Sequence, residues 1–134
     1  MNDLGSVVGI DSNILIYALN NKSVNFVKTR ELLAKLEAEN KKVVVTWQNL
    51  NEFYAVVTDQ KRFPGVLTAE QAIKRIKQLL DGGLLQMVLP NTKTKKLFLD
   101  LLVKIKPQRQ LVHDIFLVAT LLSNGVETLI TENV

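Results

Sequence analysis

The segment VVGIDSNILIYAL, residues 7–19, joins a short apolar run to an acid and then to a helix-forming stretch. The apolar run over 7–10 predicts a buried strand, and Asp11 stands where that strand should end. The Ser-Asn pair that follows favours the start of a helix reaching about Leu19. In open parallel α/β sheets, ligands bind outside the carboxyl ends of the strands. A carboxylate there costs desolvation free energy unless it meets a cation or several donors, so Asp11 is the first candidate functional residue.

Strand and helix patterns alternate along the rest of the chain. Strands that alternate with helices form βαβ units, which give a parallel sheet covered on both faces. We therefore expect one α/β domain over residues 1–134, a three-layer α/β/α sandwich around a central, mostly parallel sheet. The expected helices cover residues 24–39, 47–58, 68–80, 92–104 and 113–122, and the expected strands cover 43–45, 84–89 and 128–130.

Two of these helices have distinctive patterns. The helix over 113–122 is apolar almost all round, which predicts a buried helix. The helix over 47–58 has one apolar face, and Glu52 lies nearly opposite that face. We expect the aromatic residues of the apolar face to be core residues rather than platforms on which bases stack. The apolar face comprises Trp47, Leu50, Phe53, Tyr54 and Val57.

The composition excludes several classes of protein. The chain has 134 residues, 47% of them apolar and 22% charged, which is the balance of a soluble domain with a real core. It has no cysteine, so disulfides, thiolate metal sites and cysteine nucleophiles are excluded. No apolar run approaches the roughly 20 residues of a membrane-spanning helix, and the first residues do not resemble a signal peptide. We expect a cytoplasmic protein with no membrane partner.

The net charge of +4 is unevenly distributed. Residues 61–109 contain eleven Lys or Arg and three acids, a net charge of +8, whereas the rest of the chain carries a net −4. A basic segment of this kind can bind a polyanion such as an RNA backbone. It is equally the pattern of ordinary solvated helix surfaces, and the sequence leaves both interpretations open.

Two further acids, Glu52 and Asp114, occupy settings similar to that of Asp11, because each lies in a helix that flanks an expected strand. Carboxylates gathered at one edge of a sheet repel each other, and a hard divalent cation removes that conflict. Mg²⁺ and Mn²⁺ prefer carboxylate oxygens. The single histidine, His113, excludes a zinc site with two or three histidines. The sequence contains neither a P-loop nor the glycine pattern of a dinucleotide fold.

Each candidate also has a purely structural interpretation. Asp11 and Ser12 suit the cap of the helix that follows them. Glu52 has the setting of a solvated helix residue, and Asp114 that of an acid favoured by the helix dipole at a helix start. His113 suits a surface or capping position better than a ligand position.

Three stretches of the chain together resemble the PIN domain, and in particular the VapC-like toxins of toxin–antitoxin pairs. They are DSNILIYAL, NLNEFYAVV and HDIFLVATLLSNGVETLITEN, and the resemblance runs from Val7 to Asn133. It implies the PIN-like form of the α/β sandwich. The family usually continues with an Asp-Phe pair and a fifth strand, whereas this chain stops at Val134. We therefore expect the final edge strand to be missing.

The resemblance also implies a set of site residues. Asp11, Glu52 and Asp114 match the catalytic acids of the family, which hold Mg²⁺ or Mn²⁺ directly or through waters. Ser12 matches the small hydroxyl residue after the first acid. Thr131 and Asn133 match the Thr-x-Asp or Thr-x-Asn that follows the fourth strand, and these three residues are expected to support the metal site.

The function implied is that of a metal-dependent endoribonuclease that hydrolyses RNA phosphodiester bonds, the toxin of a toxin–antitoxin pair. A cognate antitoxin protein and a homodimer are the implied partners. An alternative of a different class is a catalytically inactive PIN-like module that binds nucleic acid or serves as a scaffold, which Asn133 favours slightly because it is not an acid. A phosphatase with Asp11 as nucleophile is a weaker alternative, because Asn13 stands where such enzymes carry a second acid.

Overall fold

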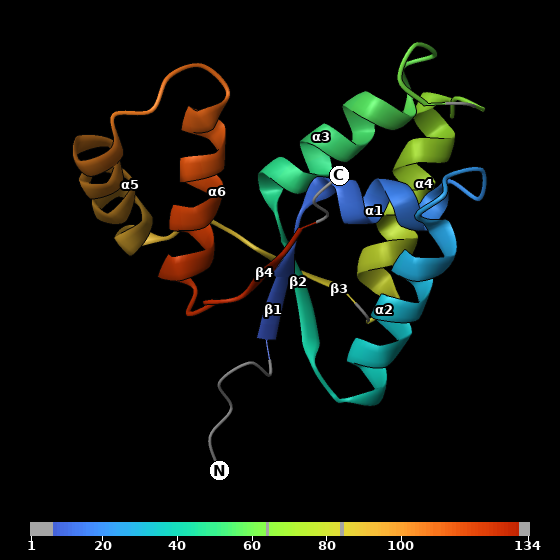
Figure 1. Ribbon diagram of the computed structural model, residues 1–134, viewed down its shortest axis with the longest axis horizontal. Helices are drawn as coiled ribbons and strands as arrows, with labels where there is room; N and C mark the ends of the chain where they lie inside the picture. Colours follow the sequence, from blue (N-terminus) through green and yellow to red (C-terminus); the bar gives the residue numbers. More distant parts are fainter. Residues whose placement is uncertain (1–6, 64, 84, 132–134) are drawn as a thin grey trace.

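The computed structural model describes residues 7–63, 65–83 and 85–131. Strands and helices alternate along these residues as the sequence predicts, so the α/β class is confirmed (Figure 1). In chain order the elements are β1 (Val7–Ile10), α1 (Ser12–Leu19), α2 (Phe26–Ala38), β2 (Lys42–Thr46), α3 (Trp47–Val57), α4 (Ala69–Asp81), β3 (Leu85–Val88), α5 (Thr92–Ile105), α6 (Leu111–Ser123) and β4 (Leu129–Ile130).

The described strands form one sheet with the order β3-β2-β1-β4, and every neighbouring pair is parallel. Val8 pairs with Val43 in β2, and Ile10 pairs with Ile130 in β4. Because all four strands run the same way, their carboxyl ends meet at one edge of the sheet. A helix that returns the chain to a parallel strand runs against it, so the first turn of α6, before β4, lies at that same edge.

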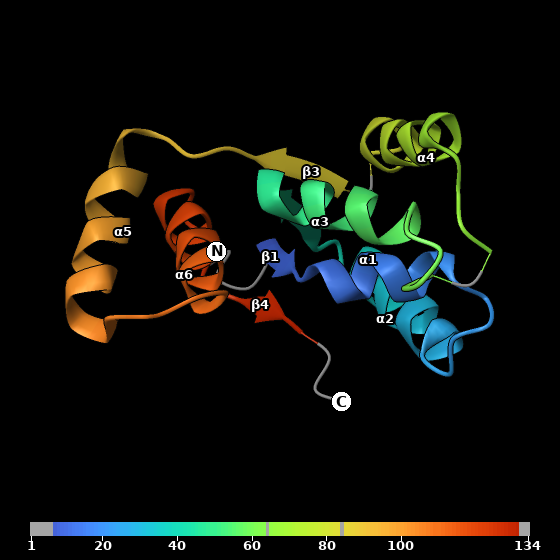
Figure 2. The same cartoon turned by 90° about the horizontal axis from the view of Figure 1, so that it is seen from above.

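Two separate apolar cores cover the two faces of the sheet. Residues of β1 and β2 that point to one face, such as Ile10 and Val45, pack with helices α1 to α4 around the buried Phe53. The opposite face of the sheet, including Val44, packs against Leu117 and other residues of α6. Figures 1 and 2 show the resulting layers, with α5 and α6 on one side of the sheet and α1 to α4 on the other. The three-layer arrangement is therefore confirmed.

Gly9 in β1 sets how closely α6 approaches the sheet. A Cβ atom at this position would lie 3.1 Å from both methyl carbons of Leu121, closer than side chains ordinarily pack. The absence of a side chain at Gly9 thus lets α6 pack directly onto β1. Asp114 lies about two turns before Leu121 on the same helix. The contact between Leu121 and β1 therefore also sets how far Asp114 lies from the sheet.

Replacing Gly9 with Val is expected to lower the free energy of unfolding by about 1–3 kcal/mol, because the added methyl groups overpack the contact with Leu121. Urea denaturation measures the loss. Adding Leu121→Ala restores room, so the double variant should be less destabilised than the sum of the two single variants. Strictly additive losses would show that the two residues do not compete for the same space.

Some boundaries and environments differ from the expectations. Helix α2 begins at Phe26 rather than residue 24, because residues 21–25 form turns. Helix α6 begins at Leu111 rather than residue 113, after the N-cap Gln110, which follows Arg109 in a left-handed conformation (φ 54°). It is not buried all round, since Leu122 near its end is exposed.

Within the described part of the chain, no helix has the length and apolar character needed to cross a membrane.

The aromatic residues of α3 do not share one environment. Phe53 is fully buried, as expected, and Tyr54 is half-buried. Trp47 is 54% exposed, so the expectation that it belongs to the core is wrong. The reason is geometric: Trp47 is the first residue of α3, and it lies more than 100° around the helix from the middle of the buried face formed by Asn49, Phe53, Val56 and Val57.

Candidate active site

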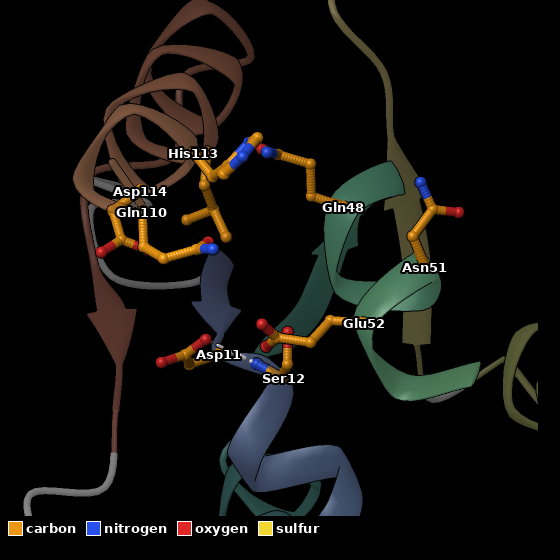
Figure 3. Close-up of a pocket in the computed structure, with 9 residues that line it drawn as sticks. Asp11, Ser12, Gln48, Asn51, Glu52, Gln110, His113 and Asp114 are labelled. Carbon is orange, nitrogen blue, oxygen red and sulfur yellow. Dashed lines mark hydrogen bonds between the residues drawn. The ribbon is translucent and has the colours of Figure 1, made fainter. Parts of the chain in front are cut away.

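An open pocket of about 360 Å³ lies at the carboxyl edge of the sheet. Three elements build it, namely the end of β1 with the start of α1, the first turns of α3, and the first turns of α6 (Figure 3). It brings together Asp11, Glu52 and Asp114, which are more than 40 residues apart along the chain. The lining residues are Asp11, Ser12, Gln48, Asn51, Glu52, Gln110, His113, Asp114 and Leu117.

Asp11 ends β1 and is also the N-cap of α1. Its Oδ1 atom accepts a hydrogen bond of 2.7 Å from the backbone N–H of Ser12. Its own backbone N–H donates to the carbonyl oxygen of Ile130 at 3.0 Å, which ties the end of β1 to β4. No residue of the described chain donates to Oδ2. The capping interpretation is therefore correct, and it leaves one carboxylate oxygen available to the pocket.

Next to Asp11 in the chain, Ser12 forms a buried polar cluster with Thr46 and Asn49. Thr46 and Asn49 form a capping box at the start of α3. In it, Asn49 Oδ1 accepts from the backbone N–H of Thr46 at 2.8 Å and from the Thr46 hydroxyl at 3.1 Å. The Asn49 side-chain NH₂ then donates to Ser12 Oγ at 3.1 Å. This contact joins the start of α3 to the start of α1, so it fixes the two helices that carry Glu52 and Ser12.

Glu52 and Asp114 enter the pocket from opposite sides. Glu52 lies on α3, and Figure 3 shows its carboxylate pointing toward Asp11 and Ser12. Asp114 lies in the first turn of α6. Both residues are exposed, and within the described residues neither forms an ion pair. Glu52 is thus a solvated helix residue and Asp114 an acid at a helix start, as their structural interpretations expect. Both residues also line the pocket.

Four polar residues of the pocket were not among the predicted site residues. Gln48 and Asn51 lie on α3, and Gln110 and His113 lie at the start of α6. Figure 3 shows Gln48 and His113 extending toward each other across the pocket. The Oε1 atom of Gln48 is buried and accepts no hydrogen bond from the described residues. A search for polar residues four positions before each predicted acid would have found both glutamines, because residues i and i+4 share a helix face.

The electrostatics of the pocket favour a cation. Its lining includes three acids and one histidine, and it contains no Lys or Arg. The donor set is hard oxygen, which suits Mg²⁺ or Mn²⁺, and Mg²⁺ is commonly held by one or two carboxylates with several waters. In the part of the chain that the structure describes, no group of three His, Asp or Glu is arranged to hold a metal ion. The roles of Asp11, Glu52 and Asp114 in holding a metal ion, directly or through waters, therefore remain a prediction.

Thr131 and Asn133 complete the predicted set of site residues. Thr131 is exposed just after β4 and is not part of the pocket lining. Asn133 lies outside the described residues. Their predicted supporting roles at a metal site thus remain expectations from the family resemblance.

The basic segment over residues 61–109 does not form a single face. Its positive residues on helices are exposed and fall mainly into two groups, one on α4 and one on α5. Figures 1 and 2 place these helices on opposite sides of the sheet, and α6 and α3, which flank the pocket, lie between them. The residues are Lys74, Arg75 and Lys77 on α4, and Lys93, Lys95, Lys96 and Lys104 on α5.

A parallel sheet of this order, with acids at its carboxyl edge, is the arrangement expected of a PIN-like domain. No model of a known protein family matches the sequence, and neither does any curated protein. Solved structures do match the fold. VapC20 of Mycobacterium tuberculosis, a toxin that cleaves the sarcin–ricin loop, is similar with a TM-score of 0.69 and 10% sequence identity, over 94% of this chain and 89% of that chain.

Two VapBC structures are also similar in fold. VapBC-1 from nontypeable Haemophilus influenzae matches with a TM-score of 0.68 and 20% identity, over 95% of this chain and 87% of that chain. VapBC2 from Rickettsia felis, solved with a DNA fragment from its promoter, matches with a TM-score of 0.63 and 16% identity, over 95% and 99% of the two chains. The chain therefore has the PIN-like fold of the VapC toxins, as the sequence predicts.

Proposed function

We propose that this protein is an endoribonuclease that hydrolyses RNA phosphodiester bonds with the help of Mg²⁺ or Mn²⁺. The observation that supports the proposal is the pocket itself: Asp11, Glu52 and Asp114 line one open cavity that contains no Lys or Arg. Its position at the carboxyl edge of a parallel sheet is where this class of fold binds ligands. The similarity in fold to VapC20, which cleaves an RNA loop, agrees with the proposal.

Asp11, Glu52 and Asp114 would hold the metal ion directly or through waters, and a bound ion would activate a water and offset charge on the leaving oxygen. Other residues of the chain would hold Asp11 in place and bind the RNA backbone. Ser12 and the backbone at the start of α1 hold Asp11 in place. The exposed lysines and arginines of α4 and α5 would bind the phosphate backbone without reading its sequence.

The proposal includes a role as the toxin of a toxin–antitoxin pair, with an antitoxin protein and a homodimer as partners. Support comes from the similarity in fold to proteins solved as VapBC complexes. The surface also has large exposed apolar side chains at Val24 just before α2, at Val27 in α2 and at Val103 on α5. A protein partner that covers such residues would remove apolar area from water.

We expect the purified protein to cleave a mixed RNA pool in the presence of Mn²⁺, with a rate that rises on titration of Mn²⁺ and is lost when EDTA removes it. Gel analysis of the products measures the rate. The fluorescence of Trp47, the only tryptophan, reports RNA binding separately, because this residue is exposed and precedes the pocket residue Gln48. Binding should weaken steeply as the salt concentration rises.

A second candidate is the inactive module that binds nucleic acid, and one observation favours it. Within the described residues, no group of three His, Asp or Glu is arranged to hold a metal. RNA binding seen by Trp47 fluorescence, with no cleavage at any Mn²⁺ concentration, would support this candidate and contradict the nuclease. Cleavage that persists in EDTA would contradict the role of the metal.

A further inference from the structure

Asn49 is an unusual residue for its place in the fold. It is only 1% exposed and lies on the buried face of α3 among apolar residues such as Phe53 and Val56. Burying an amide costs free energy unless its polar atoms are hydrogen-bonded. Here the described partners of its side chain are Thr46 and Ser12, which are themselves 1% and 2% exposed. The helix cap uses only the contacts with Thr46, whereas the contact with Ser12 satisfies the buried NH₂ group and links Asn49 to a residue that lines the pocket.

The direction of each hydrogen bond in this cluster follows from the chemistry of the groups. The backbone N–H of Thr46 can only donate, so the Asn49 atom 2.8 Å from it must be the oxygen. The other end of the amide is then the NH₂ group, which can only donate, so Ser12 Oγ must act as an acceptor in its 3.1 Å contact. The orientation of the amide is thus set by a backbone group.

This pattern leaves the hydroxyl hydrogen of Ser12 available. Ser12 Oγ accepts from Asn49, and no described residue accepts from the Ser12 hydroxyl. Ser12 lines the pocket beside Asp11 and Glu52 (Figure 3). A hydroxyl that accepts one hydrogen bond becomes a better donor for the next, because chained hydrogen bonds polarise one another. The hydroxyl is therefore prepared to donate to an oxygen atom that enters the pocket.

We propose that Asn49 is a positioning residue, which holds the Ser12 hydroxyl as a hydrogen-bond donor to a phosphate oxygen of the RNA in the pocket. The inference rests on the proposed function, and it deepens that function by naming one contact to the substrate and the residue that controls it. Ser12 lines the pocket, whereas Asn49 lies outside its lining. It acts through Ser12, and it couples the start of α3 to the start of α1.

The decisive variant is Asn49→Asp. An aspartate oxygen still accepts from the backbone N–H of Thr46, but a carboxylate cannot donate to Ser12. We expect kcat for RNA cleavage to fall about 10- to 100-fold, the usual effect of losing a partner that orients a group in the site. KM should change by no more than about threefold, since Asn49 does not bind the RNA. Steady-state cleavage rates at a series of RNA concentrations, with saturating Mn²⁺, measure both.

Thr46→Val is the matched control, because it removes a hydroxyl from the same buried cluster but keeps the backbone N–H that holds Asn49 Oδ1. We expect a lower melting temperature and a kcat within about twofold of the wild type. If Thr46→Val reduces kcat as much as Asn49→Asp at a similar loss of stability, Asn49 is only structural and the proposal is wrong.

Ser12→Ala supplies a test that does not depend on the folding of the Asn49 variant. It should reduce kcat to a similar extent, and the double variant with Asn49→Asp should be no slower than the slower single variant, because both remove the same donor. Unchanged kcat in Ser12→Ala, or additive losses in the double variant, would overturn the proposal. Wild-type protein that never cleaves RNA would instead reject the nuclease function, so the two failures are distinguishable.

Discussion

Replacing Asp11 with Asn is expected to reduce RNA cleavage by at least about 10²- to 10³-fold, the usual loss when one preorganised electrostatic group is removed from an active site. The fold should remain intact, because the asparagine oxygen can still accept from the backbone N–H of Ser12 and cap α1. The variant thus removes the negative charge from the pocket and preserves the hydrogen bond that Asp11 makes to its own helix.

The measurement compares initial rates of RNA cleavage in saturating Mn²⁺ with thermal unfolding followed by circular dichroism. Asp100→Asn is the matched control: Asp100 is an exposed acid on α5, paired with Lys96 and outside the pocket lining. It loses the same charge and should cleave at the wild-type rate. If Asp11→Asn cleaves as fast as Asp100→Asn, Asp11 is a helix cap and the pocket is not catalytic.

Asp114→Asn is expected to give a similar loss of cleavage with a small effect on stability. Asp114 is exposed in the first turn of α6, so its main structural contribution is its interaction with the helix dipole. Losing that interaction costs about 0.3–1 kcal/mol. Any relief of repulsion among the carboxylates acts in the opposite direction, and it should be small because the described acids do not form a compact group of three.

Urea denaturation measures the stability change, and the RNA cleavage assay measures the rate. Glu70→Gln is the control, because Glu70 is an exposed acid in the first turn of α4, outside the pocket. It should lose a comparable dipole interaction and retain full activity. An Asp114→Asn variant that unfolds, or that cleaves normally, would contradict a catalytic role for Asp114.

Local patterns were sufficient to predict most of the fold. Short apolar runs such as 43–45, each followed by a capped helix, predicted strands of a parallel sheet, and the structure confirms them. The parallel sheet in turn predicted that Asp11, Glu52 and Asp114 would meet at one edge, because parallel strands end on the same side. The pocket that contains all three agrees with that prediction.

Other features depended on contacts between distant residues. Trp47 has the residue type of a core position, but its burial depends on which neighbours lie beside the first turn of α3, and it is exposed. Asn49 has the residue type of a surface or capping position, and its burial against Ser12 follows from how α3 packs on α1. The basic residues over 61–109 are continuous in sequence, yet the sheet separates α4 from α5.

The sequence by itself determined the class of fold, the edge of the sheet at which the pocket lies and the three acids that line the pocket. The fold class and the edge follow from the spacing of apolar residues and from the alternation of strands and helices, which implies parallel strands ending at one edge. The three acids follow from their places beside these strands together with the resemblance to the PIN domain. Only the tertiary structure decided which polar residues join the acids and how Ser12 is oriented. Those properties depend on distances between side chains that are 37 residues apart in the chain, such as Ser12 and Asn49, and packing alone sets such distances.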